Sequence, residues 1–400
     1  MGEETTKDST HYGFTFSGIP ARLICMDKYL RRFQKNTKAF SVGIELNRSA
    51  LPSDSSAIDN DYNYPIVSLG ARYHFNDFTL HRSPDPSWGQ AQEVDYDSKV
   101  GNILTLYGSF TRPIYRNRHW MFDYSLGTGI GYCKNKYNNY NNIDNELIGS
   151  RFLIYFVGGA HVTYHLTPCW GLSAGVEFYH HSNGALNRPN KGANVVGPVF
   201  SLRYDPYYKE VIDKPKNFNP EFQKRLYLNF TVGVGGKTLH EDWQLTQFQT
   251  HPDSADYRTS RFHFYTAYSA QADIMYRYAR RWASGIGADL FYGSYASRVE
   301  KLDKQAGSKL PHSPWSVGIA LKHQVFYHQL SVAMSLGYYL YREMGESAKI
   351  IEKPYYERIG VHYSIPGLNG LTVGLNVKAH LTKADFTELI ISYPITLRRK

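Results

Sequence analysis

The sequence predicts an all-β protein made of antiparallel β-barrels that cross an outer membrane. Many segments alternate apolar and polar residues with a period of two, which is typical of a strand with one apolar side. Aromatic residues make up 15% of the chain, as expected where aromatic side chains ring both membrane interfaces. No stretch approaches the roughly 18–20 consecutive apolar residues of a membrane helix. A soluble all-β protein also alternates, but the aromatic content favours the membrane.

The first half of the chain contains eight candidate strands. In the fifth, Trp120, Phe122 and Tyr124 lie on one face and alternate with Asp123 and Ser125. The eight strands are expected at 11–23, 39–48, 65–76, 100–111, 120–133, 150–166, 170–182 and 194–205. Residues 26–35 are compatible with a short helix between the first two strands. Long polar connections alternate with short ones, as in outer-membrane barrels, where the long loops are extracellular.

A second series of eight strands follows a proline-containing segment of mixed charge, residues 206–224, which we interpret as a linker. These strands are expected at 225–236, 261–276, 281–294, 314–327, 329–342, 355–365, 371–382 and 386–396. The domain prediction is therefore a disordered N-terminus at 1–10, a barrel at 11–205, the linker, and a second barrel-like repeat at 225–400. One barrel of about sixteen strands, acting as a channel, is the alternative.

The two halves resemble a degenerate tandem repeat. Gly171–Ser182 aligns without gaps on Gly370–Leu381, with Gly, Leu, Gly and His in common. In this alignment His180 corresponds to Ala379, and Ser182 corresponds to Leu381. Any chemistry that depends on the His180–Ser182 pair therefore belongs to the first half.

The net charge of +10 fits a surface that faces lipopolysaccharide phosphates. No zinc pattern, basic helix or aromatic RNA-binding motif supports a nucleic-acid partner. We expect no cofactor and no bound metal, because no Asp-rich loop or His/Asp cluster is evident. Since a barrel of this class must be exported, we expect that a signal peptide was removed before residue 1.

The stretch Phe178–Asn194, FYHHSNGALNRPNKGAN, contains the candidate site. It ends a strand in which even-numbered residues are apolar, so His180 and Ser182 continue the apolar, outward face. An imidazole and a hydroxyl two residues apart can act as base and nucleophile of a serine esterase. On the neighbouring strand, Asn194 shares that face and can orient the imidazole. A bare His-x-Ser is more often a pair of polar residues at the membrane interface.

Two further pairs of residues complete the predicted site. Asn183 and the backbone N–H of Gly184, at the turn after the strand, are candidate oxyanion donors. Arg188 and Lys191 in the adjoining loop are candidates for binding substrate phosphates. Solvated loop charges are an equally good interpretation of that second pair.

The stretch HHSNGALNRPNKGAN, with a last strand ending in SLRY, resembles the lipid A 3-O-deacylase (PagL) family of outer-membrane acyl hydrolases over about residues 40–205. The resemblance implies an eight-stranded barrel of a Gram-negative outer membrane that removes an ester-linked acyl chain from lipid A of lipopolysaccharide. It implies Ser182 as nucleophile, His180 as base, and Asn183 and Gly184 at the oxyanion. The family orients its histidine with a glutamate, where this chain has Asn194.

Three functional hypotheses follow from the sequence. The first is the lipid A esterase. The second is a catalytically decayed barrel that binds lipopolysaccharide or a partner protein, because Asn194 cannot stabilise an imidazolium as a carboxylate does. The third is a channel formed by one large barrel. A homodimer is compatible with the sequence, and nothing in it decides the oligomeric state.

Overall fold

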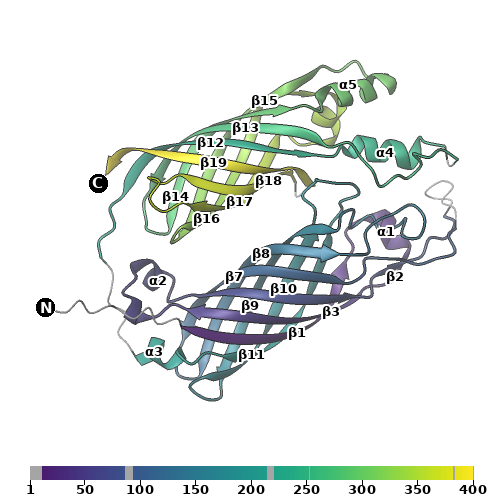
Figure 1. Cartoon of the computed structure of the whole chain (residues 1–400). Helices are drawn as coiled ribbons and strands as arrows, with labels where there is room; N and C mark the ends of the chain where they lie inside the picture. Colours follow the sequence, from purple (N-terminus) through teal and green to yellow (C-terminus); the bar gives the residue numbers. More distant parts are fainter. Residues whose placement is uncertain (1–10, 86–92, 214–219, 252, 382, 400) are drawn as a thin grey trace. The chain divides into compact units, whose positions relative to one another are not determined.

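The protein forms two closed antiparallel β-barrels of eight strands each (Figure 1). A computed structural model describes residues 11–85, 93–213, 220–251, 253–381 and 383–399. The N-terminal segment 1–10, expected to be disordered, lies outside the described residues, as does 214–219 of the expected linker. The chain divides into two compact units. The first consists of the chain up to Lys136, Arg151–Ser182 and Gly192–Pro220. The second consists of Tyr137–Ser150, Asn183–Lys191 and Glu221–Lys400.

The first barrel closes by pairing its first strand with both its second and its last. Its strands are β1 (Tyr12–Ile24), β3 (Lys38–Ser49), β4 (Ile66–Asn76), β7 (Ile103–Arg116), β8 (Trp120–Cys133), β9 (Phe152–His165), β10 (Trp170–Ser182) and β11 (Ala193–Tyr204). Its connections add a small sheet of β2 (Gln34–Asn36), β5 (Thr79–Leu80) and β6 (Ser98–Lys99), and the helices α1 (Lys28–Arg32), η1 (Pro52–Asp54) and α2 (Ala57–Asp61). Helix α3 (Tyr208–Asp213) follows β11.

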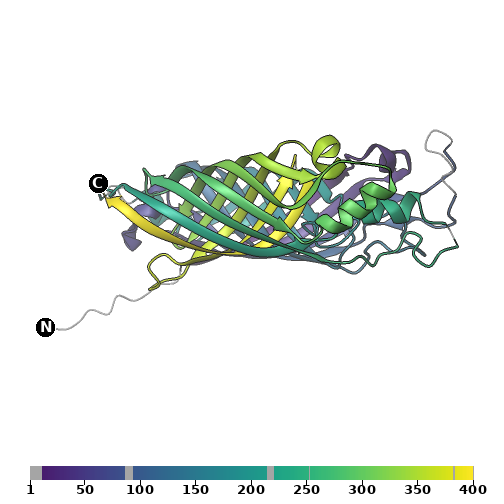
Figure 2. The same ribbon diagram turned by 90° about the horizontal axis from the view of Figure 1, so that it is seen from above.

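The second barrel closes between β12 and β19. Its strands are β12 (Arg225–Lys237), β13 (Tyr265–Arg277), β14 (Trp282–Gly293), β15 (His312–Tyr327), β16 (Leu330–Met344), β17 (Tyr355–Ser364), β18 (Thr372–His380) and β19 (Lys383–Arg399). The connections at one end carry α4 (His240–Phe248), α5 (Ala296–Gln305) and η3 (Ser347–Ile351). Figure 2 shows these strands, from green to yellow, running obliquely along the barrel, as the closure of a sheet requires.

The outer faces of both barrels are apolar. Large hydrophobic side chains on the outward positions remain exposed, for example Leu106, Leu126 and Phe200 in the first barrel and Val232 and Leu336 in the second. Exposure of this kind on every other residue is what a lipid-facing wall requires. It explains why the period-two pattern is so regular, because each strand meets lipid on one side and the packed barrel interior on the other.

The barrel interiors are filled by paired charges. In the first, the Arg72 guanidinium lies 2.7 Å from the Glu177 carboxylate, and both side chains are buried. In the second, the Lys322 ammonium lies 2.5 Å from Asp289, which also accepts a hydrogen bond from the Tyr356 hydroxyl. Buried charges are retained only when they are paired and hydrogen-bonded in this way. An eight-stranded barrel is narrow enough for such side chains to fill it.

The structure confirms the prediction of tandem eight-stranded barrels, and the single sixteen-stranded barrel is wrong. The short helix expected within 26–35 is present as α1. Strand ends differ from the predicted ones by a few residues, and the small sheet of β2, β5 and β6 was not predicted. Among the described residues, no helix combines the length and apolar character needed to cross a membrane.

Candidate functional site

Strand β10 places His180 and Ser182 on the outer face of the first barrel. Along this strand Val176 and Phe178 are 58% and 45% exposed, whereas Tyr179 and His181 are 0% and 1% exposed. Because strand neighbours alternate between faces, His180 and Ser182 project outward with the lipid-facing residues. Both are half-buried. The alternation in the sequence and the structure therefore place His180 and Ser182 on the same face of the strand.

His180 is held by Asn194 of the neighbouring strand. The β10–β11 ladder places the two residues directly opposite each other, and His180 Nδ1 lies 2.7 Å from Asn194 Oδ1. An amide oxygen can only accept, so Nδ1 carries the proton in this arrangement and Nε2 keeps its lone pair. This is the tautomer that a general base acting through Nε2 requires.

Gly192 packs against the imidazole of His180. A Cβ atom at this position would lie 2.5 Å from His180 Cε1, and the backbone has a φ of +74°. Glycine meets both conditions because it lacks Cβ and adopts positive φ without strain. In the sequence Gly192 stands out only as part of the stretch that resembles the lipid A 3-O-deacylase family; its spacing of two residues from Asn194 is the signal that could have marked it.

Ser182 has no side-chain hydrogen bond among the residues that the structure describes. Its ladder partner on β9 is Ile154. Residues two apart on a strand are separated by roughly 7 Å along its axis, a distance that an imidazole and a hydroxyl can bridge when they lean toward each other. Catalytic hydrogen bonds are often loose before substrate binds. The structure thus brings His180 and Asn194 into contact and leaves Ser182 on the same face.

The other titratable residues near this strand face the barrel interior. Glu177 pairs with Arg72, so it does not orient His180. His181 Nε2 lies 3.0 Å from Thr105 Oγ1, and His161 Nδ1 lies 3.0 Å from Asp123. These contacts belong to the buried polar network inside the barrel. His181 and His161 therefore have a structural role that requires no catalytic one.

The turn after Ser182 belongs to the second unit, and Asn183 holds it with its backbone N–H and its side-chain amide. The backbone N–H of Asn183 donates to Asn190 Oδ1 at 2.8 Å, and its side-chain Nδ2 donates to Ser150 Oγ at 2.9 Å. Gly184 follows with a φ of +60°. Asn183 therefore anchors the turn, and the assignment of Asn183 and of the N–H of Gly184 to the oxyanion stays a prediction.

Arg188 and Lys191 lie in the same loop and have partners within the second unit. Arg188 Nε donates to the carbonyl of Thr238 at 3.1 Å. Lys191 Nζ lies 2.5 Å from Glu146 and 5.8 Å from the centre of the Trp243 ring. Both cations of the loop are thus held in place. Of the guanidinium nitrogens of Arg188, Nε makes the contact with Thr238.

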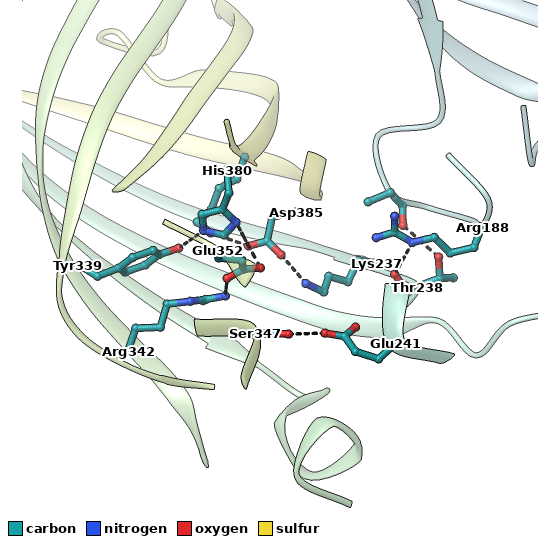
Figure 3. A network of polar contacts seen from close by, with 12 residues as sticks. Arg188, Lys237, Thr238, Glu241, Tyr339, Arg342, Ser347, Glu352, His380 and Asp385 are labelled. Atoms are coloured by element: carbon teal, nitrogen blue, oxygen red, sulfur yellow. Dashed lines mark hydrogen bonds and ion pairs between the residues drawn. The ribbon is translucent and has the colours of Figure 1, made fainter. Parts of the chain in front are cut away.

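The second barrel contains a different polar cluster, shown in Figure 3. One ligand atom from each of Glu352, His380 and Asp385 lies within 4.8 Å of the others. Three cations surround them: Asp385 pairs with both Lys237 and Lys378, and Glu352 pairs with Arg342. A divalent ion there would face all three positive side chains, so an ion-pair network explains this cluster better than a metal site.

The carboxylate of Glu352 shows the same electrostatics. Burial would raise its pKa, yet Arg342 and His380 hold the pKa below its usual value. His380 also lies 2.9 Å from the Tyr339 hydroxyl through Nε2. Glu352 is therefore ionised and paired with its neighbours. The position aligned with Ser182 is occupied by Leu381, which has no hydroxyl.

Two family models match the chain. Residues 63–203 match the model described as lipid A 3-O-deacylase (PagL), and residues 226–397 match the model described as acyloxyacyl hydrolase, C-terminal domain. Together they span most of the chain, one on each barrel. No curated protein matches the sequence.

Solved structures with some likeness are far more distant. The crystal structure of the outer membrane enzyme PagL aligns at 13% identity with a TM-score of 0.29, covering 47% of this chain and 97% of that one. A variant of the Rh. blastica porin aligns at 6% identity with a TM-score of 0.17, covering 96% of this chain and 99% of that one. Scores this low add nothing to the fold or the site.

Proposed function

This chain belongs to the lipid A 3-O-deacylase (PagL) family of the outer membrane, and we propose that it is a serine esterase that removes an ester-linked acyl chain from lipid A. The observation that carries the proposal is the 2.7 Å contact between His180 Nδ1 and Asn194 Oδ1. It holds the His180 imidazole on the same outward face as Ser182, which supports a role for His180 as the base. A lipid substrate reaches that wall by lateral diffusion in the outer leaflet.

The proposed reaction begins with proton transfer. His180 Nε2 accepts the proton of the Ser182 hydroxyl as Oγ attacks the ester carbonyl of the acyl chain. The tetrahedral oxyanion that forms is stabilised by the backbone N–H of Gly184. His180 then protonates the departing sugar oxygen, which leaves the acyl group on Ser182. A water molecule, activated by the same imidazole, hydrolyses the acyl-enzyme and releases the fatty acid.

Asn194 and Asn183 have supporting roles in this scheme. Asn194 keeps Nδ1 protonated and the ring in place, but as a neutral residue it stabilises the imidazolium less than a carboxylate would. Asn183, whose two donors bind Asn190 and Ser150, holds the turn that carries Gly184. We assign it to positioning the oxyanion donor.

We propose that Arg188 meets a phosphate of lipid A through its terminal guanidinium nitrogens, since Nε alone is used toward Thr238. A planar guanidinium binds phosphate in a bidentate manner. Lys191 adds positive potential nearby, reduced by its pairing with Glu146. The partner is therefore lipopolysaccharide itself, in the outer membrane.

The test is release of fatty acid from lipopolysaccharide by the purified protein, followed by mass spectrometry of both products. Ser182→Ala and His180→Asn should each abolish the release. Ser173→Ala is the matched control, because Ser173 lies on the same strand but is buried on the inner face. Full release by either site variant refutes the assignment of the residues.

The second candidate is a barrel that binds lipopolysaccharide without cleaving it. The neutral Asn194, in the position where the family resemblance implies a glutamate, is the observation that favours it. Lipid A isolated from cells with and without the protein separates the two candidates: an unchanged mass in both, together with binding of lipopolysaccharide to the purified protein, supports the second.

A further inference from the structure

One end of the second barrel carries a surplus of positive charge. Helices α4 and α5 lie at one end of this barrel, and β19 ends at the other, where the strands are joined by short turns (Figure 1). At the short-turn end, the side chains that the structure describes include one carboxylate, Glu221, and six cations. These cations, which we call the basic rim, are Lys224, Arg225, Arg277, Arg280, Arg281 and Arg398. One carboxylate cannot neutralise six cations.

Strand pairing brings the cations of the basic rim together. Arg225 on β12 stands directly opposite Arg277 on β13 in the strand ladder. Side chains paired in this way lie close to each other, and like charges at such positions destabilise a sheet. The hairpin between β13 and β14 has Arg280 and Arg281 at its tip. The fold therefore gathers side chains that repel one another, and an anionic ligand would relieve that repulsion.

Aromatic rings hold the arginines in place. The guanidinium carbon of Arg277 lies 4.0 Å from the centre of the Phe326 ring, and that of Arg281 lies 4.8 Å from the centre of the Trp282 ring. Arg277 Nη2 also donates to the carbonyl of Arg280 at 2.5 Å. A guanidinium stacked on a ring keeps its charge, and its N–H donors lie in the guanidinium plane. The rings therefore orient these cations without neutralising them.

The outer wall beside the basic rim has the composition of a membrane interface. Trp282, Ser284 and His323 occupy outward positions, which alternate along β14 and β15 with the buried Ala283 and Lys322. Tryptophan is enriched where a membrane meets water. Ser284 Oγ lies 2.9 Å from His323 Nδ1, directly across the ladder. Polar side chains like these are costly in hydrocarbon, so this level of the wall faces lipid head groups.

The side of the membrane follows from the connections. In outer-membrane barrels the short turns are periplasmic and the long loops are extracellular. The head groups that reach the basic rim are therefore those of the periplasmic leaflet. Arginine suits the phosphate of a head group, because its planar guanidinium offers paired N–H donors to phosphate oxygens. Each cation near an anionic lipid surface strengthens binding about fivefold.

We propose that the basic rim binds the phosphate groups of anionic phospholipids in the periplasmic leaflet, with Arg280 and Arg281 at the hairpin tip as principal ligands. The lipid carries a net negative charge, since a surplus of positive charge attracts an anionic head group more strongly than a zwitterionic one. This activity uses residues of the second unit alone. It gives the second barrel a function that does not depend on the His180–Ser182 pair or on the proposed esterase reaction.

The experiment is native mass spectrometry of the whole chain in detergent micelles, titrated with phosphatidylglycerol or with phosphatidylcholine of the same acyl chains. Arg280→Gln/Arg281→Gln removes two charges from the basic rim, and Arg280→Lys/Arg281→Lys keeps them. Lys301→Gln/Lys309→Gln is the matched control, because both lysines are exposed at the α5 end of the same barrel. Inorganic phosphate, added at the concentration of the lipid, distinguishes a site for free phosphate from a site for lipid. Thermal unfolding of each variant is measured in parallel.

The unaltered protein should bind phosphatidylglycerol more tightly than phosphatidylcholine, and this preference tests the inference even where a variant is less stable. The glutamine pair should weaken phosphatidylglycerol binding about 25-fold, the product of two fivefold losses. The lysine pair should retain most of the affinity, and the control pair all of it.

Four results overturn the inference: equal affinity for the two lipids, undiminished affinity in the glutamine pair, an equal loss in the control pair, or displacement of the lipid by inorganic phosphate. None of them depends on fatty-acid release from lipopolysaccharide. The proposed function is therefore tested separately.

Discussion

Replacing Asn194 by glutamate should make the enzyme faster. In Ser-His-Asp triads, changing the acid to its amide lowers kcat about 10⁴-fold, mainly because the histidine adopts the wrong tautomer. Here the short contact joins Nδ1 to an amide oxygen, so the tautomer is already correct. What a neutral partner fails to supply is the charge that stabilises the imidazolium in the transition state.

The size of the gain follows from the hydrogen bond. A bond to a charged partner contributes about 1–2 kcal/mol more than a neutral one, and each 1.36 kcal/mol corresponds to tenfold in rate. We therefore expect Asn194→Glu to raise kcat about 5- to 30-fold. Because the contact forms on the outer wall and does not involve the acyl chain, KM should change little.

The assay is the initial rate of fatty-acid release from lipopolysaccharide at saturating substrate. Asn194→Gln is the matched control, since it has the length of glutamate and no charge, and it should be no faster than the unaltered protein. A glutamate variant that folds normally but is no faster than the glutamine variant would contradict the claim that His180 becomes an imidazolium held by residue 194.

Two further predictions follow from residues around the loop. Gly192→Ala should abolish or severely reduce release, because the added Cβ meets His180 Cε1 and the backbone has positive φ; Gly307→Ala, a positive-φ glycine with open space around it, is the control for backbone strain. In the second unit, burial and the nearby cations Arg188, Lys383, Lys191 and Lys237 lower the pKa of His240 to about 3. The unfolded chain takes up this proton near pH 6.5, so stability should be full above that pH and fall as the pH drops from 6.5 toward 3; a His240→Asn variant that shows the same decline in unfolding free energy would disprove it.

The strands and the outward face of the site were predictable because one physical condition governs them. A barrel wall in lipid must be apolar at every second residue, so the alternation through Val176 and Phe178 determines where His180 and Ser182 point. A few residues are enough to make this prediction, because successive side chains of a strand alternate between its two faces. The opposition of His180 and Asn194 followed from placing two strands side by side.

The number of barrels was harder to predict, because closure depends on pairing between distant strands. Sixteen alternating segments fit one large barrel or two small ones equally well by period. The first barrel closes separately because β1 pairs with β11 rather than with a strand of the second half. The interior offers a partial explanation: Arg72, Glu177 and the charges around them need partners at close range, which a narrow barrel provides and a wide one does not.

The partners of the loop could not be predicted at all. Asn183 and Gly184 were identified by their place after a strand, but nothing in the sequence links the turn to Thr238, Thr387 or Ser150, whose hydroxyls form hydrogen bonds with it. Threonine is common in strands. A single hydrogen bond from a hydroxyl to a carbonyl far away in the sequence produces no repeating pattern of residues that could be recognised. For the same reason the sequence did not show that the side-chain Nδ2 of Asn183 donates to Ser150 Oγ and its backbone N–H to Asn190 Oδ1.

The seventh strands of the two barrels share an inward face and differ on the outward face. His181 on β10 and His380 on β18 both point inward, as their alignment requires, and both are buried among polar partners. The outward positions differ: β10 presents His180 and Ser182, whereas the second barrel has Ala379 on β18 and Leu381 directly after it. Beyond β18 the next strand begins at Lys383, which leaves no room for a loop comparable to Asn183–Lys191. The second barrel therefore has neither the His180–Ser182 pair nor a loop that corresponds to the one after it.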